Sequence, residues 1–501
     1  PYASYLCVSA AIFFNPASID MLMLANTGTN YSFSKYYKTP HISKRPKNKR
    51  NFVYIYAESL ERTYFDEAIF PGLIKGLRDL ESHSNYFTNI NGVANTGWTV
   101  AGITASQCGI PLFSPSHANS MSGMDKFLAG ATCLGDLLKE EGYQLSYLGG
   151  APLSFAGKGK LFSTHGFDSV RGIVELNDLL PVKYYKNAWG LFDDTLFDIA
   201  LKDFNALSSS GKPFGMFMLT LDTHHPNGHP SKNCKGILYK NGSNPILNAV
   251  ACSDYLISRF AKEIMQSPYG DNTEIFIASD HLGMRNTAFE LLKKGNRKNL
   301  FMAIDPKDKG PNKVSKKGST LDIAPTVLHF LGYEGEIGLG RNLMGNEKSL
   351  ISQLDDVDNV LRGWKPEIIS FWDFPHIEKG VTIDPIKSSI TIDDRTFEVP
   401  ILVEFNEKLE TTVTFEWLGS DWKYRRLAGQ VLKLARDTPI LWVDNCSTMY
   451  QQAEKKGLCV SAGKVGAKPL INTKIDRITS ISVEQLKQVV QLKVTNIIGA
   501  E

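Results

Sequence analysis

The sequence has 501 residues, of which 43% are hydrophobic and 21% are charged, and its net charge is +3. At roughly 100–200 residues per domain, this length predicts two or three domains. The composition excludes a disordered chain, and the small net charge argues against nucleic acid as the main partner. The chain starts at Pro1, and we expect a further segment upstream of it.

The N-terminal part contains one apolar and one basic stretch. The apolar stretch "YLCVSAAIFF" at 5–14 is shorter than the about 20 residues that cross a bilayer, so it fits either the end of a membrane helix or a short buried segment. The basic run "SKRPKNKR" at 43–50 fits either a solvated linker or a patch for anionic lipid headgroups. We assign 1–47 to the end of a membrane segment and a linker, and expect association with a membrane.

The cysteines indicate the compartment. Cys7 stands alone, and the others form three pairs that are close in sequence: Cys108 and Cys133, Cys234 and Cys252, and Cys446 and Cys459. Such pairing favours disulfides and an oxidising compartment, although three pairs of reduced, buried cysteines would give the same pattern. The absence of a CxxC motif from the sequence argues against a thiolate metal site.

Apolar runs alternate with amphipathic stretches between 48 and 365. The amphipathic pattern predicts helices over 131–142 and 251–266. Nearly continuous apolar runs predict strands over 51–59, 143–151, 213–225, 273–281 and 299–305. Strands of this kind alternating with helices indicate an α/β domain, in which a mostly parallel sheet lies between helices.

The pattern changes after about residue 366. Short alternating runs such as "VTIDPIKSSITIDD" at 381–394 are separated by turn residues, which is typical of antiparallel strands. A late helix is expected over 482–492. We therefore predict a smaller, β-rich C-terminal domain over 366–501, without a catalytic cluster of its own.

Polar residues follow three of the predicted strands of the first domain. Glu58 closes the first strand, His224 and His225 follow "MLTLD", and Asp280 and His281 close "EIFIAS". The carboxyl ends of parallel strands meet at one edge of a sheet, so these side chains are expected to converge. Carboxylates and an imidazole at such an edge can bind a divalent cation such as Zn²⁺ or Mn²⁺ and leave one coordination position open.

The stretch "WTVAGITASQCG" at 98–109 contains the candidate nucleophile. Thr99 stands at the start of a predicted helix, with Gly109 ten positions later. A threonine hydroxyl is a poor nucleophile unless a divalent cation coordinates it and favours the alkoxide. The helix N-terminus would also offer backbone N–H groups to a phosphate. A threonine that merely caps a buried helix would look the same, so the assignment depends on the companion motifs.

These motifs together resemble the alkaline-phosphatase and sulfatase superfamily. "NFVYIYAES" is similar to its first strand with a metal-binding acid, and "IASDHLG" is similar to its Asp-His metal motif. "GSTLDIAPTVLHFLG" followed by "GLGRNL" resembles its C-terminal segment, and the motifs cover 51–345 in the family's order. The resemblance implies the α/β fold of that superfamily.

Within the superfamily, the chain resembles the transferases of lipid headgroups. "YAES", a threonine nucleophile and "THHP" are shared with lipoteichoic acid synthases and with the phosphoglycerol transferases of osmoregulated periplasmic glucans. "GWTVAGITASQCGIPL", "LSFAGKGKLFSTHGF" at 153–167 and the β-rich extension are most similar to the latter. The resemblance implies transfer of phosphoglycerol from phosphatidylglycerol to a glucan through a phospho-threonine intermediate. It also implies a periplasmic location, anchored to or released from the inner membrane.

The same resemblance implies a set of metal ligands. Glu58, Thr99, Asp280 and His281 match the positions that bind one divalent ion, and Thr99 matches the nucleophile. Oxygen ligands with one imidazole suit Mn²⁺, which Mg²⁺ or Zn²⁺ could replace.

Four further residues are expected to contact the substrate. His224 matches the family histidine near the phosphate and leaving group, and His225 is the weaker candidate for that catalytic role. Lys158 falls near an arginine that holds phosphoglycerol in lipoteichoic acid synthases, although the tryptophan beside that arginine has no counterpart here. We also assign Trp98, next to the nucleophile, to substrate binding.

Three other functions were weighed. Sulfatases need cysteine or serine as nucleophile, with proline and arginine two and four residues later, whereas this chain has Thr99, Ala101 and Ile103. This argues against sulfatase activity. A phosphoethanolamine transferase acting on lipid A or a glycan also uses threonine and is the main alternative. A non-catalytic glycan-binding protein is the other, and the intact set of metal ligands speaks against it.

Overall fold

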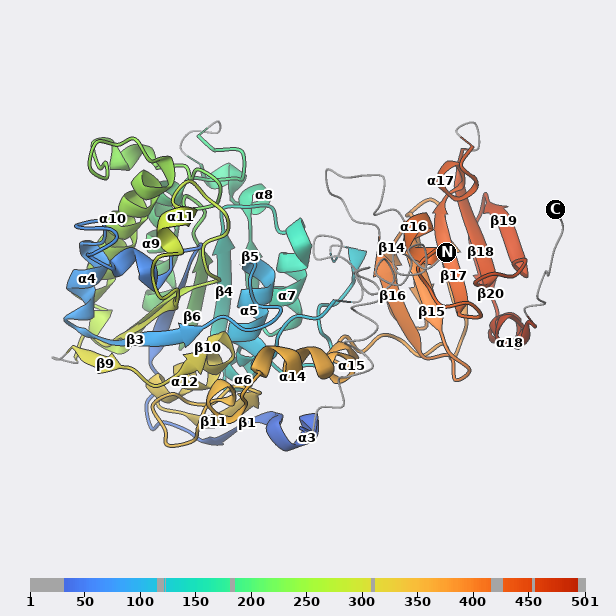
Figure 1. The fold of residues 1–501 in the computed structure, drawn as a ribbon, viewed down its shortest axis with the longest axis horizontal. Helices are drawn as coiled ribbons and strands as arrows, with labels where there is room; N and C mark the ends of the chain where they lie inside the picture. Colours follow the sequence, from blue (N-terminus) through green and yellow to red (C-terminus); the bar gives the residue numbers. More distant parts are fainter. Residues whose placement is uncertain are drawn as a thin grey trace, which may run out of the picture. The chain divides into compact units, whose positions relative to one another are not determined.

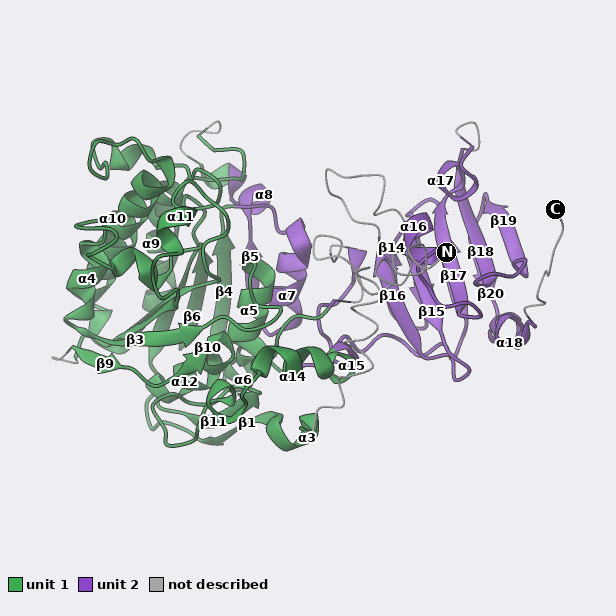
Figure 2. Ribbon diagram, viewed as in Figure 1, with its two compact units in different colours: residues 1–113, 132–150, 178–368 green, residues 114–131, 151–177, 369–501 purple. Residues whose placement is uncertain are grey.

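The computed structural model describes residues 31–114, 121, 123–180, 185–307, 311–415, 427–452 and 456–493. The chain forms two compact units (Figure 1, Figure 2). The first unit comprises 1–113, 132–150 and 178–368, and the second comprises 114–131, 151–177 and 369–501. Two segments that we counted with the first predicted domain thus belong to the second unit. The domain limits themselves stay a prediction.

The predicted linker is partly regular structure. Within 38–44 the chain forms a strand, β1, which pairs with the strand β11. The next basic side chains make ion pairs, because Arg45 lies 2.8 Å from Glu141 and Lys44 lies 2.6 Å from Glu334. This part of the chain is thus held by strand pairing and ion pairs, while the linker over 1–47 stays a prediction. The stretch 5–14 lies outside the described residues, and among those described no helix is long and apolar enough to cross a membrane.

The first unit contains a central sheet surrounded by helices (Figure 1). Its strands are β1 (Lys38–Lys44), β2 (Asn51–Ala57), β3 (Ser84–Asn91), β4 (Gln144–Gly149), β6 (Phe214–Leu219), β7 (Thr273–Ser279), β8 (Asn299–Ile304), β9 (Asn312–Val314), β10 (Gly318–Ser319) and β11 (Glu334–Gly338). Its main helices are α3 (Phe33–Tyr36), α4 (Gly76–Glu81), α5 (Thr99–Cys108), α6 (Leu134–Glu140), α9 (Asp193–Ser209), α10 (Pro245–Gln266), α11 (Phe289–Leu292), α12 (Ile323–Phe330), α13 (Leu350–Gln353) and α14 (Val357–Gly363), followed by α15 (Lys365–Ser370) at the boundary.

The central sheet is mixed, with a parallel core. Its strands in this unit run in the order β10-β3-β8-β7-β2-β6-β4, and β9 also pairs with β3. Strand β2 is parallel to both β6 and β7, and β4 is parallel to β6, whereas β8 is antiparallel to β3 and β7. Every residue of β2, β6 and β7 is buried, so both faces of the sheet are covered. The predicted α/β architecture is confirmed.

Local sequence signals explain where the long helices begin. Helix α10 begins at Pro245, because the side chain of Asn244 accepts a hydrogen bond from the Leu247 N–H at 3.3 Å and proline suits the first helical position. Its start lies upstream of the predicted 251. Helix α9 contacts β4 and β6, and α10 contacts β7. These contacts bury the apolar sides of both helices.

Disulfides join the three predicted cysteine pairs. Their Cα atoms are 4.0 Å apart in Cys108–Cys133, 5.4 Å in Cys234–Cys252 and 4.9 Å in Cys446–Cys459. The first one links the last residue of α5 to the residue that precedes α6. The end of the helix that begins with Thr99 is thereby tied covalently to the next helix of the unit.

The second unit is β-rich, as predicted. Its strands are β5 (Ser169–Arg171), β12 (Val381–Asp384), β13 (Ser389–Ile392), β14 (Arg395–Glu398), β15 (Ile401–Phe405), β16 (Thr411–Phe415), β17 (Pro439–Asn445), β18 (Leu458–Lys464), β19 (Ile471–Ile475) and β20 (Thr479–Ile481). Its helices are α7 (Lys158–Thr164), α8 (Ile173–Leu176), α16 (Leu427–Val431), α17 (Cys446–Tyr450) and α18 (Val483–Gln491).

Two antiparallel sheets make up most of this unit. One has the order β14-β13-β12-β20, and the other has the order β16-β15-β17-β18-β19. Leu402, Ile440 and Trp442 form an apolar cluster on the second sheet with Leu427 of α16. Helix α18 matches the late helix that we expected, and Ser482 caps it by accepting a hydrogen bond from the Gln485 N–H.

Candidate active site

Three of the predicted metal ligands lie together at one edge of the central sheet. Glu58 follows β2, and Asp280 and His281 follow the parallel neighbour β7. The Nε2 atom of His281 lies 3.6 Å from Glu58 Oε1 and 3.4 Å from Asp280 Oδ2. Their candidate ligand atoms all lie within 4.8 Å of one another, and all three residues are buried. The convergence expected from the strand ends is present.

Thr99 is the first residue of α5 and faces this cluster. Its Oγ1 atom lies 3.5 Å from Glu58 Oε2 and 3.5 Å from His281 Nε2. Side chains from two strands and one helix therefore meet at one point. Residues 100–108 of α5 are all buried, which explains why the sequence of this helix shows no clear apolar face.

Two glycines let α5 approach its neighbours closely. A Cβ atom on Gly102 would lie 1.7 Å from the carbonyl oxygen of Asp280, so only glycine fits where α5 passes the loop after β7. Gly109 ends the helix in a left-handed conformation with φ of 64°. A Cβ atom there would lie 2.3 Å from the carbonyl oxygen of Ile337.

Burial and mutual charge dominate the electrostatics of the cluster. Burial, followed by the negative charge of Glu58, raises the pKa of Asp280 to about 7. Burial opposes protonation of His281, but the charges of Asp280 and Glu58 raise its pKa overall. Two carboxylates are thus held in a dry site with one imidazole between them, an arrangement that a bound cation would stabilise.

The atoms of the cluster fit a divalent metal ion. Asp280 Oδ2 is buried without a hydrogen-bond partner among the described residues. His281 Nδ1 lies 2.7 Å from the Leu282 carbonyl oxygen and donates to it, which leaves Nε2 free to coordinate. Ligands about 2.1 Å from one tetrahedral ion lie about 3.4 Å apart, close to the separations seen here. These three residues can therefore hold a metal ion.

A second layer of hydrogen bonds fixes the loops that carry these ligands. The Ser59 N–H donates to Asp280 Oδ1 at 2.9 Å, and the Thr220 hydroxyl accepts from the Glu58 N–H at 3.0 Å. Glu61 accepts from the Gly283 N–H at 2.9 Å and forms an ion pair with Arg297. The loops after β2, β6 and β7 are therefore linked to one another beneath the cluster.

His224 and His225 lie in the loop after β6. His224 Nδ1 lies 2.9 Å from the His225 carbonyl oxygen and donates to it. Burial is the main reason why the pKa of His224 is lowered, although the charge of Asp280 acts in the opposite direction. The Trp189 ring packs against the His224 ring with centroids 4.0 Å apart and the ring planes tilted by 35°, and the His225 ring lies 4.6 Å from the His224 ring.

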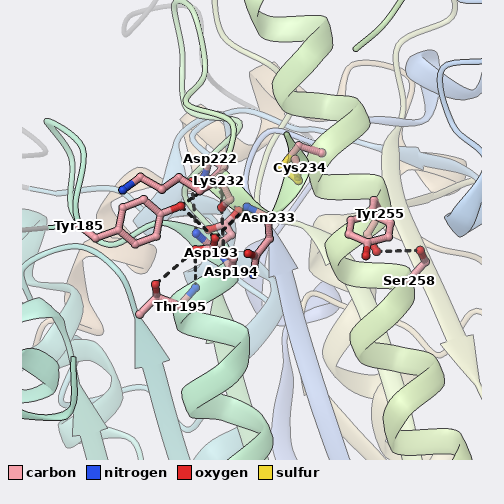
Figure 3. The surroundings of a disulfide bond; sticks show 12 residues. Tyr185, Asp193, Asp194, Thr195, Asp222, Lys232, Asn233, Cys234, Tyr255 and Ser258 are labelled. Carbon is pink, nitrogen blue, oxygen red and sulfur yellow. Dashed lines mark hydrogen bonds between the residues drawn. A yellow bond between two sulfur atoms is a disulfide. The ribbon is translucent and has the colours of Figure 1, made fainter. Parts of the chain in front are cut away.

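A network of carboxylates holds the loop that carries these histidines (Figure 3). Asp193, at the start of α9, accepts hydrogen bonds from the Leu221 N–H at 2.6 Å and the Asp222 N–H at 3.1 Å. Asp222 in turn accepts from the Asp193 N–H at 3.3 Å and from the Ser231 hydroxyl. Burial raises the pKa of Asp193 to about 7, and burial together with the Asp193 charge raises the pKa of Asp222 as well.

The structure also describes two other residues that were predicted to bind the substrate. Trp98 is the half-buried residue that precedes the first turn of α5. Lys158 is buried at the start of α7, in the second unit. Their roles in substrate binding stay predictions.

Sequence reasoning missed Trp189, Asp193 and Asp222. Asp222 stands two positions before His224 and could have been predicted from the sequence, because it too is a polar residue at the end of a predicted strand. Trp189 and Asp193 follow no motif in the sequence, and only the fold brings them to the His224 loop.

Comparison with known proteins agrees with this geometry. The family model described as Sulfatase matches residues 50–333. The chain belongs to the sulfatase family. A second model, described as the middle domain of phosphoglycerol transferase I, matches residues 379–498, which lie in the β-rich second unit.

Curated relatives extend the likeness over most of the chain. Phosphoglycerol transferase I of Escherichia coli O6:K15:H31 is 38% identical over 448 residues, which are 88% of this chain and 58% of that protein. The Shigella flexneri protein of the same name is 38% identical over 467 residues, covering 91% and 60% of the two chains. This chain therefore spans less than two thirds of the length of these relatives.

Solved structures share the fold. A Vibrio parahaemolyticus protein of the alkaline phosphatase superfamily has a TM-score of 0.52 and 24% identity, covering 65% of this chain and 78% of its own. The lipoteichoic acid synthase LtaP of Listeria monocytogenes has a TM-score of 0.51 and 14% identity, covering 67% and 95%. At these identities the likeness concerns the fold alone.

Substituting Gly102 tests the close packing of α5. We expect Gly102→Ala to weaken metal binding and to lower the melting temperature by several degrees, because the new methyl group collides with the Asp280 backbone. Gly97→Ala is the control, since a Cβ atom there meets nothing within 4 Å. Calorimetry and metal titration measure both variants. Wild-type metal affinity in Gly102→Ala would contradict the packing argument.

Metal binding tests the ligand cluster. Asp280→Asn should weaken Mn²⁺ binding by at least about tenfold, because a neutral amide replaces a charged ligand. Asp305→Asn is the control, since this carboxylate follows the antiparallel β8, and its oxygen pairs with Arg50 at 2.7 Å. Equilibrium dialysis with elemental analysis measures both. Equal affinities in the two variants would exclude Asp280 as a ligand.

The pH dependence of stability tests the Asp193 network. A folded pKa of about 7, compared with about 3.9 in the unfolded chain, means that the folded state binds more protons between these values. This carboxyl group therefore makes the protein less stable as pH rises from about 4 to 7. In Asp193→Asn the melting temperature should fall less steeply over this range than in the wild type, as calorimetry at a series of pH values measures. Identical slopes for the two proteins would refute the assignment.

Proposed function

We propose that this chain is a metal-dependent transferase that moves phosphoglycerol from phosphatidylglycerol to a glucan through a covalent intermediate on Thr99. The position of Thr99 Oγ1, 3.5 Å from both Glu58 and His281, carries the proposal, because a nucleophile stands beside a buried metal-binding set. The 38% identity to phosphoglycerol transferase I and the matching middle-domain model support the choice of phosphoglycerol.

Thr99 performs the first displacement. A divalent cation held by Glu58, Asp280 and His281 would favour the deprotonated Thr99 hydroxyl and offset the charge on the phosphate. We propose Mn²⁺ in the cell, with Mg²⁺ or Zn²⁺ as substitutes. Thr99 Oγ1 forms a bond to phosphorus as the bond to the diacylglycerol oxygen breaks. The N–H groups of the first turn of α5 would stabilise the negative charge of a phosphate held beside Thr99.

His224 exchanges the protons of the two steps. As imidazolium it protonates the departing diacylglycerol oxygen, and as neutral imidazole it then takes the proton of the attacking glucan hydroxyl. Its Nδ1–H is occupied by the His225 carbonyl oxygen, so Nε2 is the atom that carries this proton. A pKa lowered by burial makes the imidazolium a better acid in the first step. The histidine and Thr99 return to their starting states after each cycle.

The remaining predicted residues are proposed to hold the substrates. Trp98, next to the nucleophile, and Lys158 of the α7 segment would contact the phosphoglycerol group, and His225 would contact it through the edge of its ring. The lysine ammonium would pair with the phosphate as a point charge, whereas the arginine of lipoteichoic acid synthases has a planar group with several N–H donors. The β-rich second unit is proposed to belong to the same transfer activity, because its matching family model is named after that enzyme.

The compartment follows from the chemistry of the cysteines and substrates. Three disulfides persist in an oxidising environment, which supports a periplasmic location at the inner membrane, where the lipid donor and the glucan meet. We propose that the chain acts there, either anchored to the membrane or released from it.

Product analysis tests the function and its alternatives. The chain with Mn²⁺ is mixed with phosphatidylglycerol, phosphatidylethanolamine and a β-glucan, and products are identified by mass spectrometry. We expect diacylglycerol and a glucan heavier by phosphoglycerol, and we expect chelator to suppress both. A phosphoethanolamine mass would favour the alternative transferase. Glucan binding without any transfer would favour the non-catalytic protein.

The same assay tests the covalent step. Thr99→Ala should lose nearly all turnover while metal binding persists, and Thr99→Ser should retain part of the turnover. In the wild type, a phosphoglycerol ester on Thr99 should accumulate when glucan is left out. Thr104→Ser, a buried threonine of the same helix whose hydroxyl has no hydrogen-bond partner among the described residues, should keep wild-type turnover. Two displacements give retention at phosphorus. Inversion, or full turnover in Thr99→Ala, would replace this scheme by direct attack of the glucan.

A further inference from the structure

A short hairpin places one tryptophan beside the proposed catalytic histidine. Residues 186 and 191 form an isolated antiparallel bridge, and the Asn187 N–H donates to the Gly190 carbonyl oxygen at 2.8 Å. The side chain of Asn187 also accepts from the N–H groups of Trp189 and Gly190 at 2.8 and 3.1 Å. Trp189 thus stands at the tip of a turn whose backbone is held by its own hydrogen bonds.

The base of this hairpin is anchored to the carboxylate network (Figure 3). The Tyr185 hydroxyl donates to Asp194 Oδ2 at 2.9 Å and accepts from the Lys232 N–H at 2.6 Å. The ring of Tyr185 also stacks on Phe192, with centroids 4.5 Å apart. Both ends of the hairpin are therefore fixed, and its tip needs little ordering when a ligand binds.

The Trp189 ring is only partly covered. The His224 imidazole packs against it at a tilt of 35°, with ring centroids 4.0 Å apart, yet 36% of the residue remains exposed. A tryptophan that served only to fill the core would be buried more fully. A large aromatic surface is thus held rigidly in solvent, directly against the histidine that exchanges protons with the acceptor.

We infer that Trp189 forms a binding subsite for a sugar ring of the acceptor glycan, an inference that rests on the proposed function. The flat aromatic surface matches the C–H face of a pyranose ring, and tryptophan offers a large contact area at a small cost in side-chain entropy. A sugar held there keeps the neighbouring hydroxyls of the glycan close to His224 Nε2.

The surroundings of Trp189 favour a sugar over a lipid chain. Its neighbours in the hairpin are the exposed Lys186, the half-buried Asn187 and the exposed Ala188, and the facing loop continues with His225, Pro226 and Asn227. The lysine, asparagine and histidine side chains of this set can hydrogen-bond to hydroxyl groups. An acyl chain would need a continuous aliphatic surface, which this set does not provide.

Direct binding is the first test. The full chain with Mn²⁺ is titrated by calorimetry with an unsubstituted β-glucan oligosaccharide. Trp189→Ala should lower the affinity by about tenfold or more, and Trp189→Phe should recover most of it, because a smaller aromatic surface remains. Tyr255→Ala is the matched control, since this tyrosine is 39% exposed on α10 and belongs to no part of the proposed machinery. Equal glucan affinity in wild type and Trp189→Ala, or no glucan binding by wild type, overturns the inference.

Steady-state kinetics separates the subsite from a structural role. Trp189→Ala should raise the KM for glucan by about tenfold, while the KM for phosphatidylglycerol, the Mn²⁺ affinity and the melting temperature stay at wild-type values. A rise confined to the KM for phosphatidylglycerol would assign Trp189 to the donor and overturn the inference. If wild type binds glucan but transfers nothing, the proposed function fails, whereas the binding comparison still decides the role of Trp189.

Discussion

The site depends on two carboxylates that are buried within a few ångströms of each other. Glu58 and Asp280 are both almost fully buried, and His281 lies between them. Like charges in a medium of low dielectric repel strongly, so the folded chain has to supply compensation. The imidazole and the N–H groups of Ser59 and His281 offset part of this repulsion. The repulsion that remains is the reason why the site suits a cation.

The scaffold holds these charges in place from several directions. Parallel strands β2 and β7 position the carboxylates, and α5 positions Thr99 because Gly102 allows contact with the loop after β7. The loop after β6 is linked to Glu58 through Thr220 and to α9 through Asp193. The loop that carries His224 is therefore linked by a hydrogen bond to Glu58 of the cluster, and the position of His224 depends on that of the cluster.

The sequence predicted the parts of the site that lie on strongly patterned elements. Glu58, Asp280 and His281 end apolar runs, and Thr99 begins a helix, so their convergence follows from the topology of a parallel sheet. The antiparallel direction of β8 was not predictable, because an apolar run carries no sign of its direction. Trp189 was missed for a similar reason: its neighbour His224 lies on a loop that folds back only in three dimensions. Strand ends are visible in sequence, whereas contacts between loops are not.

The interleaving of the two units has a consequence for how this protein can be divided. Segments 114–131 and 151–177 belong to the second unit although the chain on both sides of each belongs to the first. A single cut near residue 368 would leave a β-rich fragment without two of its own pieces. Neither unit is one continuous segment of the chain, so neither can be separated or transferred whole by a single cut.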